Sequence, residues 1–123
     1  AMMLLAERIA RKEECGALVT GESIGQVASQ TLQAIACTDA VAEMPVFRPL
    51  IAMDKDEIVA LSRRIDTFEI SIQPYEDCCT VFTPKHPKTR PQLDAVEKAQ
   101  ALIPLEELME RALAGVKIVP IDA

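Results

Sequence analysis

The sequence predicts an α/β fold in which a parallel sheet lies between layers of helices, followed by an irregular loop and carboxyl-terminal helices. Short apolar runs alternate with helical patterns over residues 1–65, an order typical of three-layer, parallel-sheet folds. The chain has 123 residues, which fits one domain or part of one. Half of its residues are hydrophobic but only 3% are aromatic, so we expect an aliphatic core.

Spacing predicts the first three elements. Residues 2–14 place apolar side chains at helical intervals, and Gly16 is the expected helix stop. The continuous apolar run over residues 17–21 is typical of a buried parallel strand, and residues 23–35 have a helical pattern with small residues on one face. Because no capping residue precedes Met2, we expect the chain to have been cut from a longer protein.

The next two elements are a strand and a capped helix. Residues 47–51 have the composition of a second short strand, and Pro49 favours a place at the edge or the end of a sheet. Asp54 is the expected N-cap of the helix that follows, and Glu57 is the expected partner in a capping box.

The second half of the chain begins with an irregular segment. Prolines are frequent from residue 67 to residue 91, which predicts a loop. Helical spacing resumes at Gln92 and again over residues 105–114, where Gly115 is the expected stop. Residues 116–120 have the composition of a terminal strand.

Charge and hydropathy exclude some classes of function. A formal net charge of −6 argues against nucleic-acid binding by bulk electrostatics, which needs clustered cations. No run of about 20 apolar residues predicts a membrane span. Charges at Glu7 and Arg8 come too early for a secretory signal. We therefore expect a cytoplasmic protein, in which cysteines are more often catalytic, metal-binding or core residues than disulfide-bonded ones.

The adjacent thiols of Cys78 and Cys79 are the first candidate for chemistry. Two carboxylates precede them, and Lys85 and His86 follow in a proline-rich loop. A thiolate is the reactive form, and neighbouring carboxylates disfavour it whereas neighbouring cations favour it. The residues alone leave two alternatives open. Either one of the thiols is reactive, or one cysteine is buried and the other is exposed but inert.

Other sulfur and metal chemistry has weaker support. Cys15 and Cys37 lie in or beside helices among apolar residues, so we expect both to pack. His86 is the only histidine, and the thiols do not form two separated pairs, so we expect no zinc site.

The junction after residues 17–21 is the second candidate site. Ligands of open parallel sheets bind beyond the carboxyl ends of the strands, and Gly21 would let a ligand approach the backbone. Gln30 follows within the predicted helix. The alternative is an ordinary tight turn, which residue types alone favour because short glycine motifs are common.

Several ordered blocks of this sequence resemble one known family. The blocks are Thr20–Leu32, Arg48–Lys55, Glu69–Cys79 and Pro84–Thr89. In this order they are similar to the tRNA 4-thiouridine synthetases, also called thiamine-biosynthesis sulfurtransferases. The resemblance implies a Rossmann-like fold of the adenine nucleotide alpha hydrolase kind. Residues 1–123 would then be the carboxyl-terminal portion of a PP-loop ATP pyrophosphatase domain.

The resemblance also implies a reaction and its residues. Members of the family use ATP, with Mg²⁺ expected beside it, to adenylate a tRNA uridine, and a cysteine desulfurase supplies persulfide sulfur to make 4-thiouridine. They are also linked to sulfur supply for thiamine. Gly21 and Gln30 match positions that contact ATP. The sulfur-carrying cysteine falls on Cys79, or on Cys78 if the match slips by one residue.

The chain also departs from the family pattern. The phosphate-binding Ser-Gly-Gly-x-Asp-Ser loop and the tRNA-binding domains are missing, so we expect this chain alone to be inactive. Uncovered strand edges predict that it forms a homo-oligomer. The competing hypothesis is a non-catalytic α/β interaction module with structural cysteines.

Overall fold

Two short parallel strands form the sheet in this computed structural model, which describes residues 1–26, 30–75 and 90–121. Strand β1 (Leu18–Val19) pairs with β2 (Val46–Phe47), so that Leu18 lies opposite Val46 and Val19 opposite Phe47. A hydrogen bond from the Thr20 amide to the Phe47 carbonyl, 3.0 Å long, extends the pairing beyond β1. The expected parallel α/β arrangement is confirmed.

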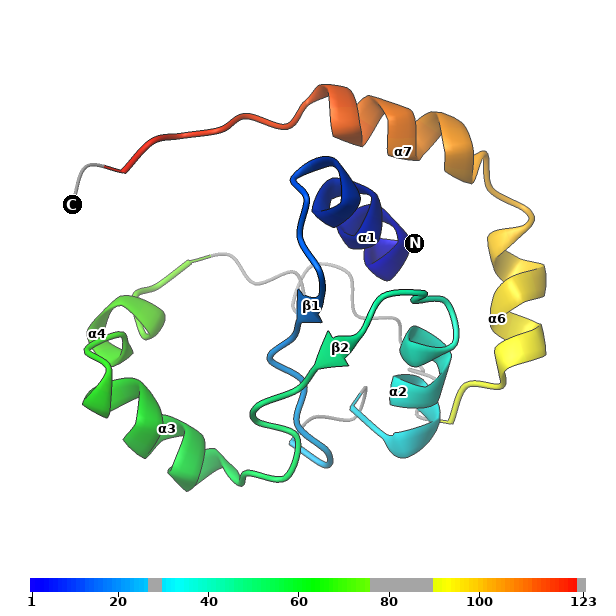
Figure 1. Ribbon diagram of the computed structural model, residues 1–123. Coiled ribbons are helices and arrows are strands. Elements are labelled where there is room, and N and C mark those ends of the chain that lie inside the picture. The colour runs from blue at the N-terminus through cyan, green and yellow to red at the C-terminus, as the bar shows by residue number, and fades with distance from the viewer. Residues whose placement is uncertain (27–29, 76–89, 122–123) are drawn as a thin grey trace.

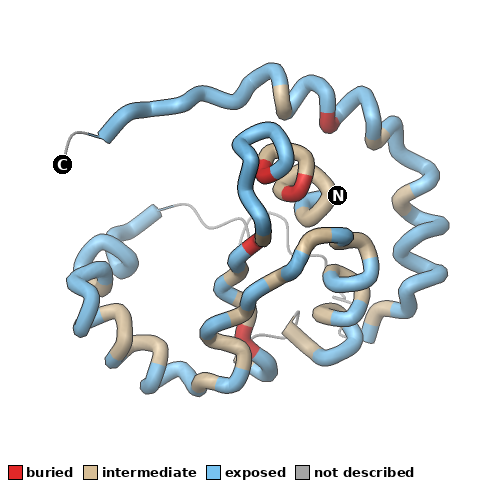
Figure 2. Tube along the Cα trace, viewed as in Figure 1, coloured by how far each residue is buried: buried red, intermediate tan, exposed pale blue. Residues whose placement is uncertain are grey.

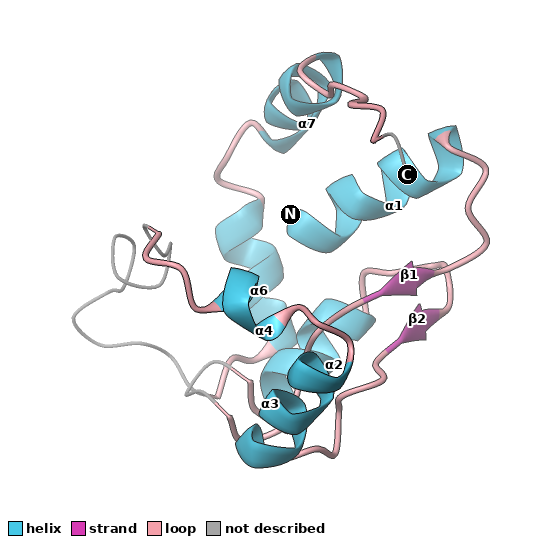
Figure 3. Ribbon diagram, turned by 90° about the vertical axis from the view of Figure 1, so that its left-hand side faces the viewer, coloured by secondary structure: helices cyan, strands magenta, loops and turns pink. Residues whose placement is uncertain are grey.

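Helices lie on both sides of this sheet. Helix α1 (Met2–Lys12) lies on one side, and α2 (Leu32–Asp39) and α3 (Lys55–Arg64) lie on the other, as Figures 1 and 3 show. Both strands run in the same direction, so the segments that follow them meet at one edge of the sheet.

The later helices run along the outside of these layers (Figure 1). Helix α6 (Leu93–Gln100) packs on α2, and α7 (Leu105–Ala114) packs on α1, which confirms the two expected carboxyl-terminal helices. The prediction of a continuous loop from residue 67 was wrong at its start, because α4 (Phe68–Ser71) forms one helical turn there. The Arg63 guanidinium lies 4.5 Å from the centre of the Phe68 ring and holds this turn against α3.

Local capping explains where α3 begins. The Glu57 amide donates to Asp54 Oδ1 at 2.9 Å, and the Asp54 amide donates to Glu57 Oε2 at 2.8 Å. These reciprocal bonds satisfy two amides that a helix start leaves free, so the predicted capping box is confirmed.

Three predicted boundaries were wrong. The helix expected from Ser23 begins only at Leu32, because Gly25 has a φ of 81° and Thr31 is the N-cap. The second strand ends at Phe47, since Pro49 has no amide for a ladder. Residues 116–121 form no strand, and the sheet in the described residues consists of β1 and β2.

Few side chains are buried in the described residues (Figure 2). The buried ones are Glu7, Ala10, Leu18, Ser23 and Met109. Glu7 joins α1 to the segment before β2, since its carboxylate accepts from the Glu43 amide and from the Arg11 guanidinium. The Glu43 amide, followed by Arg11, holds the pKa of the Glu7 carboxyl below its usual value.

None of the helices in the described ranges is long and apolar enough to cross a membrane.

Candidate functional site

The candidate site lies where β1 and β2 end. Residues 20–26 leave β1, and residues 48–54 leave β2 at the same edge of the sheet. In open parallel sheets this edge is where ligands bind. The predicted residue Gly21 lies in the first of these segments, which we call the Gly21 turn and define as residues 20–26.

Backbone and side-chain bonds fasten the Gly21 turn to the segment after β2. The Ser23 side chain is only 1% exposed, and its hydroxyl donates to the Met53 carbonyl at 2.8 Å. Gln26 Nε2 donates to the same carbonyl at 3.3 Å, and the Ile24 amide donates to the Ile51 carbonyl at 3.1 Å. The turn is therefore fixed at several points along its length.

Gln30 reaches back to this turn. Its Oε1 accepts from the Ser23 amide at 3.2 Å, and its backbone carbonyl accepts from the Gly25 amide at 3.0 Å. Gln30 is thus bonded to the turn that contains Gly21, through Ser23 and Gly25, although the helix that was expected to carry Gln30 starts after it.

Gly21 itself has open space around it. A Cβ built on Gly21 would meet no atom within 4 Å, and its φ is outside the left-handed range. The fold therefore does not require glycine at this position. The lack of a side chain leaves the backbone accessible at the edge where a ligand would bind.

Arg48 links three segments around the same turn. Its Nε donates to Glu22 Oε2 at 2.9 Å, and its Nη1 donates to Asp39 Oδ1 at 3.0 Å. Glu22 also accepts from Thr20 Oγ1 at 3.0 Å and from Thr38 Oγ1 at 3.2 Å. Burial alone would lower the pKa of the Arg48 guanidinium, but hydrogen bonds and charge from Glu22 and Asp39 outweigh it, so this pKa is raised.

Sequence reasoning did not single out Arg48, Glu22 or Asp39. Arg48 directly follows a strand and Glu22 directly follows Gly21, so the rule that parallel strands end at one edge would have placed these two side chains together.

The cysteines fall into two groups. Cys78 and Cys79 lie outside the described residues. Cys37 is half-buried, and its thiol lies 3.9 Å from the Pro91 carbonyl, in line with the expected packing. The same expectation for Cys15 was wrong, because Cys15 is exposed just beyond α1. No group of three or more metal-ligating side chains occurs in residues 1–26, 30–75 and 90–121.

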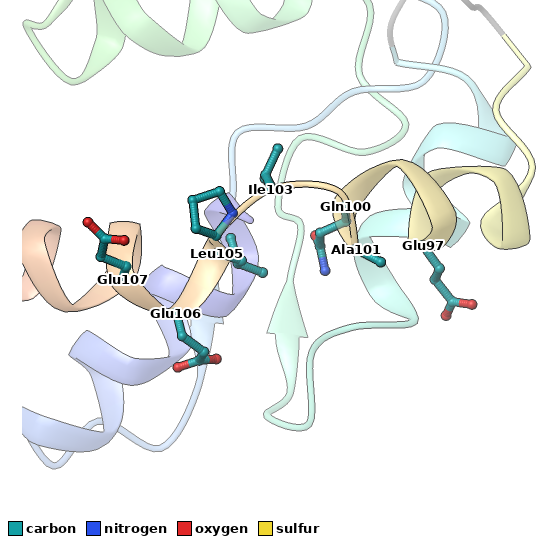
Figure 4. Close-up of a pocket in the computed structure, with 8 residues that line it drawn as sticks. Glu97, Gln100, Ala101, Ile103, Leu105, Glu106 and Glu107 are labelled. Atoms are coloured by element: carbon teal, nitrogen blue, oxygen red, sulfur yellow. The ribbon is translucent and has the colours of Figure 1, made fainter.

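A hollow of about 470 Å³ lies elsewhere, at the junction of α6 and α7 (Figure 4). Three carboxylates line it and no cationic side chain does, the charged members being Glu97, Glu106 and Glu107. This lining is unfavourable for an anion such as a nucleotide, so the strand ends remain the candidate site.

Comparison of the sequence with models of known protein families gives one match. The model of the family described as thiamine biosynthesis protein (ThiI) matches residues 1–105. The chain belongs to the ThiI family. Its match covers both strands, the Gly21 turn and every residue bonded to Arg48.

Similar proteins carry related names. A probable tRNA sulfurtransferase of Alkaliphilus metalliredigens is 56% identical over 95% of this chain and 30% of its own length. One of Acetivibrio thermocellus is 53% identical over 98% of this chain and 31% of its own. The ThiI-family chain described here thus spans about 30% of the length of these relatives.

One solved structure has the same fold. It is the crystal structure of a 4-thiouridine synthetase–RNA complex with bound ATP, with a TM-score of 0.86 and 45% identity. The match covers 94% of this chain and 30% of that one. The expected α/β fold of this family is therefore confirmed.

Proposed function

We propose that residues 1–123 are the carboxyl-terminal portion of a PP-loop ATP pyrophosphatase domain in a tRNA sulfurtransferase. The observation that carries this proposal is the likeness, at 45% identity over 94% of the chain, to a 4-thiouridine synthetase bound to RNA and ATP. The PP-loop and the tRNA-binding domains belong to the remaining length of such an enzyme. The protein is proposed to act in the cytoplasm.

The proposed reaction is ATP-dependent transfer of persulfide sulfur to a tRNA uridine, giving 4-thiouridine. ATP activates the uridine oxygen as an adenylate, and AMP leaves as the outer sulfur of the persulfide bonds to the same carbon. A second thiol then attacks the inner sulfur, so that the S–S bond breaks, 4-thiouridine is released and the two thiols end as a disulfide. Cys79, or its neighbour Cys78, carries the sulfur, and a cysteine desulfurase loads it. The same persulfide is proposed to feed the thiazole of thiamine, since the family is described by thiamine biosynthesis.

The strand ends fit one part of this reaction. Open space around Gly21 allows close approach of ATP to the backbone. The Gln30 side chain accepts a hydrogen bond from the amide of Ser23, which lies two residues after Gly21. These residues would bind and orient the nucleotide, while Mg²⁺ would accompany the ATP phosphates. No described residue is assigned a bond-making role.

Complementation tests the proposed function. The full-length enzyme containing this chain is expected to restore 4-thiouridine to the tRNA of a bacterial strain that lacks its own synthetase, as measured by mass spectrometry of digested tRNA. The purified enzyme with a desulfurase and cysteine should thiolate tRNA only when ATP is added. Absence of thiouridine in both assays would refute the proposed function. Thiolation without ATP would refute the proposal that the strand ends bind ATP for this reaction.

The isolated chain is proposed to self-associate. Its accessible surface is 10050 Å², whereas a compact monomer of 13.5 kDa exposes roughly 6,500 Å². Large apolar side chains contribute to this excess, among them Val19 and Phe47 of the two strands. In the full-length enzyme the remainder of the domain would cover such surface.

Sedimentation velocity checks this expectation. The 123-residue chain is expected to sediment as a dimer or larger species at micromolar concentration, because burial of exposed apolar side chains drives association. A single compact monomer over the whole concentration range would contradict it.

A further inference from the structure

Arg48 holds the Gly21 turn through the residue next to Gly21. Arg48 directly follows β2, and its guanidinium binds Glu22 at 2.9 Å and Asp39 at 3.0 Å. The Arg48 side chain is only 13% exposed and that of Glu22 only 21%. One planar group therefore joins the ends of both strands to the last residue of α2.

The Glu22 carboxylate accepts three hydrogen bonds in this arrangement. Arg48 Nε and Thr20 Oγ1 both donate to Glu22 Oε2, and Thr38 Oγ1 donates to Glu22 Oε1. Gly21 lies between Thr20 and Glu22, which are bonded to each other, and Glu22 is bonded in turn to Arg48. The path of the backbone at Gly21 is thus set by side chains on either side of it.

Electrostatics favour an arginine at this point. Asp39 ends α2, where the helix dipole is negative, and α2 has no basic residue in its last turn. Arg48 supplies the missing cation from another segment. The planar fork of a guanidinium can donate to two carboxylates in fixed directions, which a single ammonium cannot match.

Stability alone does not account for Arg48. Its Nη2 atom is buried and makes no hydrogen bond with any described residue, and an unsatisfied buried donor costs free energy. Largely buried ion pairs are also often no more stabilising than apolar side chains of the same size. The bonds from Arg48 to Glu22 and Asp39 instead fix the geometry of the Gly21 turn.

We propose that Arg48 is a positioning residue that sets the backbone of the Gly21 turn for ATP without touching the nucleotide. This inference rests on the proposed function. Its consequence is that a change at Arg48 weakens ATP binding through Glu22, while the chemical step keeps its rate.

The test is Arg48→Lys in the full-length enzyme, with ATP as the varied substrate in the tRNA thiolation assay. We expect KM for ATP to rise about five- to tenfold and kcat to change less than about twofold, since only binding geometry is altered. Glu22→Gln should raise the same KM. The double variant should raise it by less than the product of the two single effects, because the two residues act through one bond.

Arg11→Lys is the matched control. Arg11 also binds two carboxylates, those of Glu7 and Glu43, but it joins α1 to the segment before β2. Its replacement should leave KM for ATP unchanged. If Arg48→Lys fails to fold, Thr38→Val removes the hydroxyl that Glu22 and the Ile35 carbonyl share, with little change in shape, and it should raise KM for ATP more modestly.

The outcomes separate this inference from the function on which it rests. If KM for ATP is unchanged in both Arg48→Lys and Thr38→Val, the proposed role of Arg48 is overturned. The same holds if Arg11→Lys raises KM for ATP as much as Arg48→Lys does. Neither result contradicts the proposed thiolation of tRNA. A loss of kcat without a change of KM would also overturn the role of Arg48, since a positioning role in binding predicts the reverse. Failure of the unmodified enzyme to thiolate tRNA refutes the proposed function instead.

Discussion

Cys79→Ser in the full-length enzyme is expected to abolish 4-thiouridine while ATP binding stays nearly intact. A serine hydroxyl cannot carry a transferable sulfur atom, so no persulfide forms at this position. Cys78→Ser should cost less activity. The measurement is 4-thiouridine per tRNA by mass spectrometry, together with ATP affinity by calorimetry.

Cys15→Ser is the control for this prediction, because Cys15 is free and exposed beyond α1. It should leave thiolation unchanged. Undiminished thiouridine in Cys79→Ser would refute the assignment to Cys79. Equal loss in the Cys78 and Cys79 variants would mean that the two thiols act together.

Gly21→Val is expected to raise KM for ATP about a hundredfold, which corresponds to about 2.7 kcal/mol of lost binding. The added side chain meets no protein atom within 4 Å of its Cβ, so it occupies space that we assign to the nucleotide. The midpoint of thermal unfolding should change little, because the backbone at Gly21 is outside the left-handed range.

Gly16→Val is its matched control. A Cβ at Gly16 likewise meets nothing within 4 Å, and Gly16 lies between α1 and β1, away from the strand ends. Its KM for ATP should equal that of the unmodified enzyme. If Gly21→Val binds ATP normally, the nucleotide does not approach this turn, and the site must be sought elsewhere.

The sequence predicted the elements that local signals control. The capping box of α3, the start of α6 and both ends of α7 depend on neighbouring residues, and the structure confirms them. The late start of α2 was missed because residues 23–35 have helical spacing throughout. Nothing in that spacing indicates that Gly25 adopts a left-handed conformation, which interrupts a helix. Tertiary bonds decided that boundary, since the Gly21 turn is held by the segment after β2.

The candidate site was predictable only in part. The resemblance placed Gly21 and Gln30 in one site, and in the structure Gln30 is bonded to Ser23, two residues after Gly21. The arginine network joins Arg48 to residues 26 and 9 positions away, and no periodic pattern reveals such pairs. Which carboxylates an arginine binds follows from strand pairing, which spacing along the chain does not encode.

The contact between α1 and α7 has a consequence for how this chain folds. Arg8 makes two bonds to Glu106, at 2.7 and 2.8 Å, across a sequence separation of 98 residues. Closing so long a loop costs entropy before any bond forms, so topologies of this kind fold slowly. The contact between α1 and α7 is therefore expected to form late in folding. A proteolytic cut in the α6–α7 connection should release α7, whereas α1 stays attached through β1 and through the bond from the Glu43 amide to Glu7.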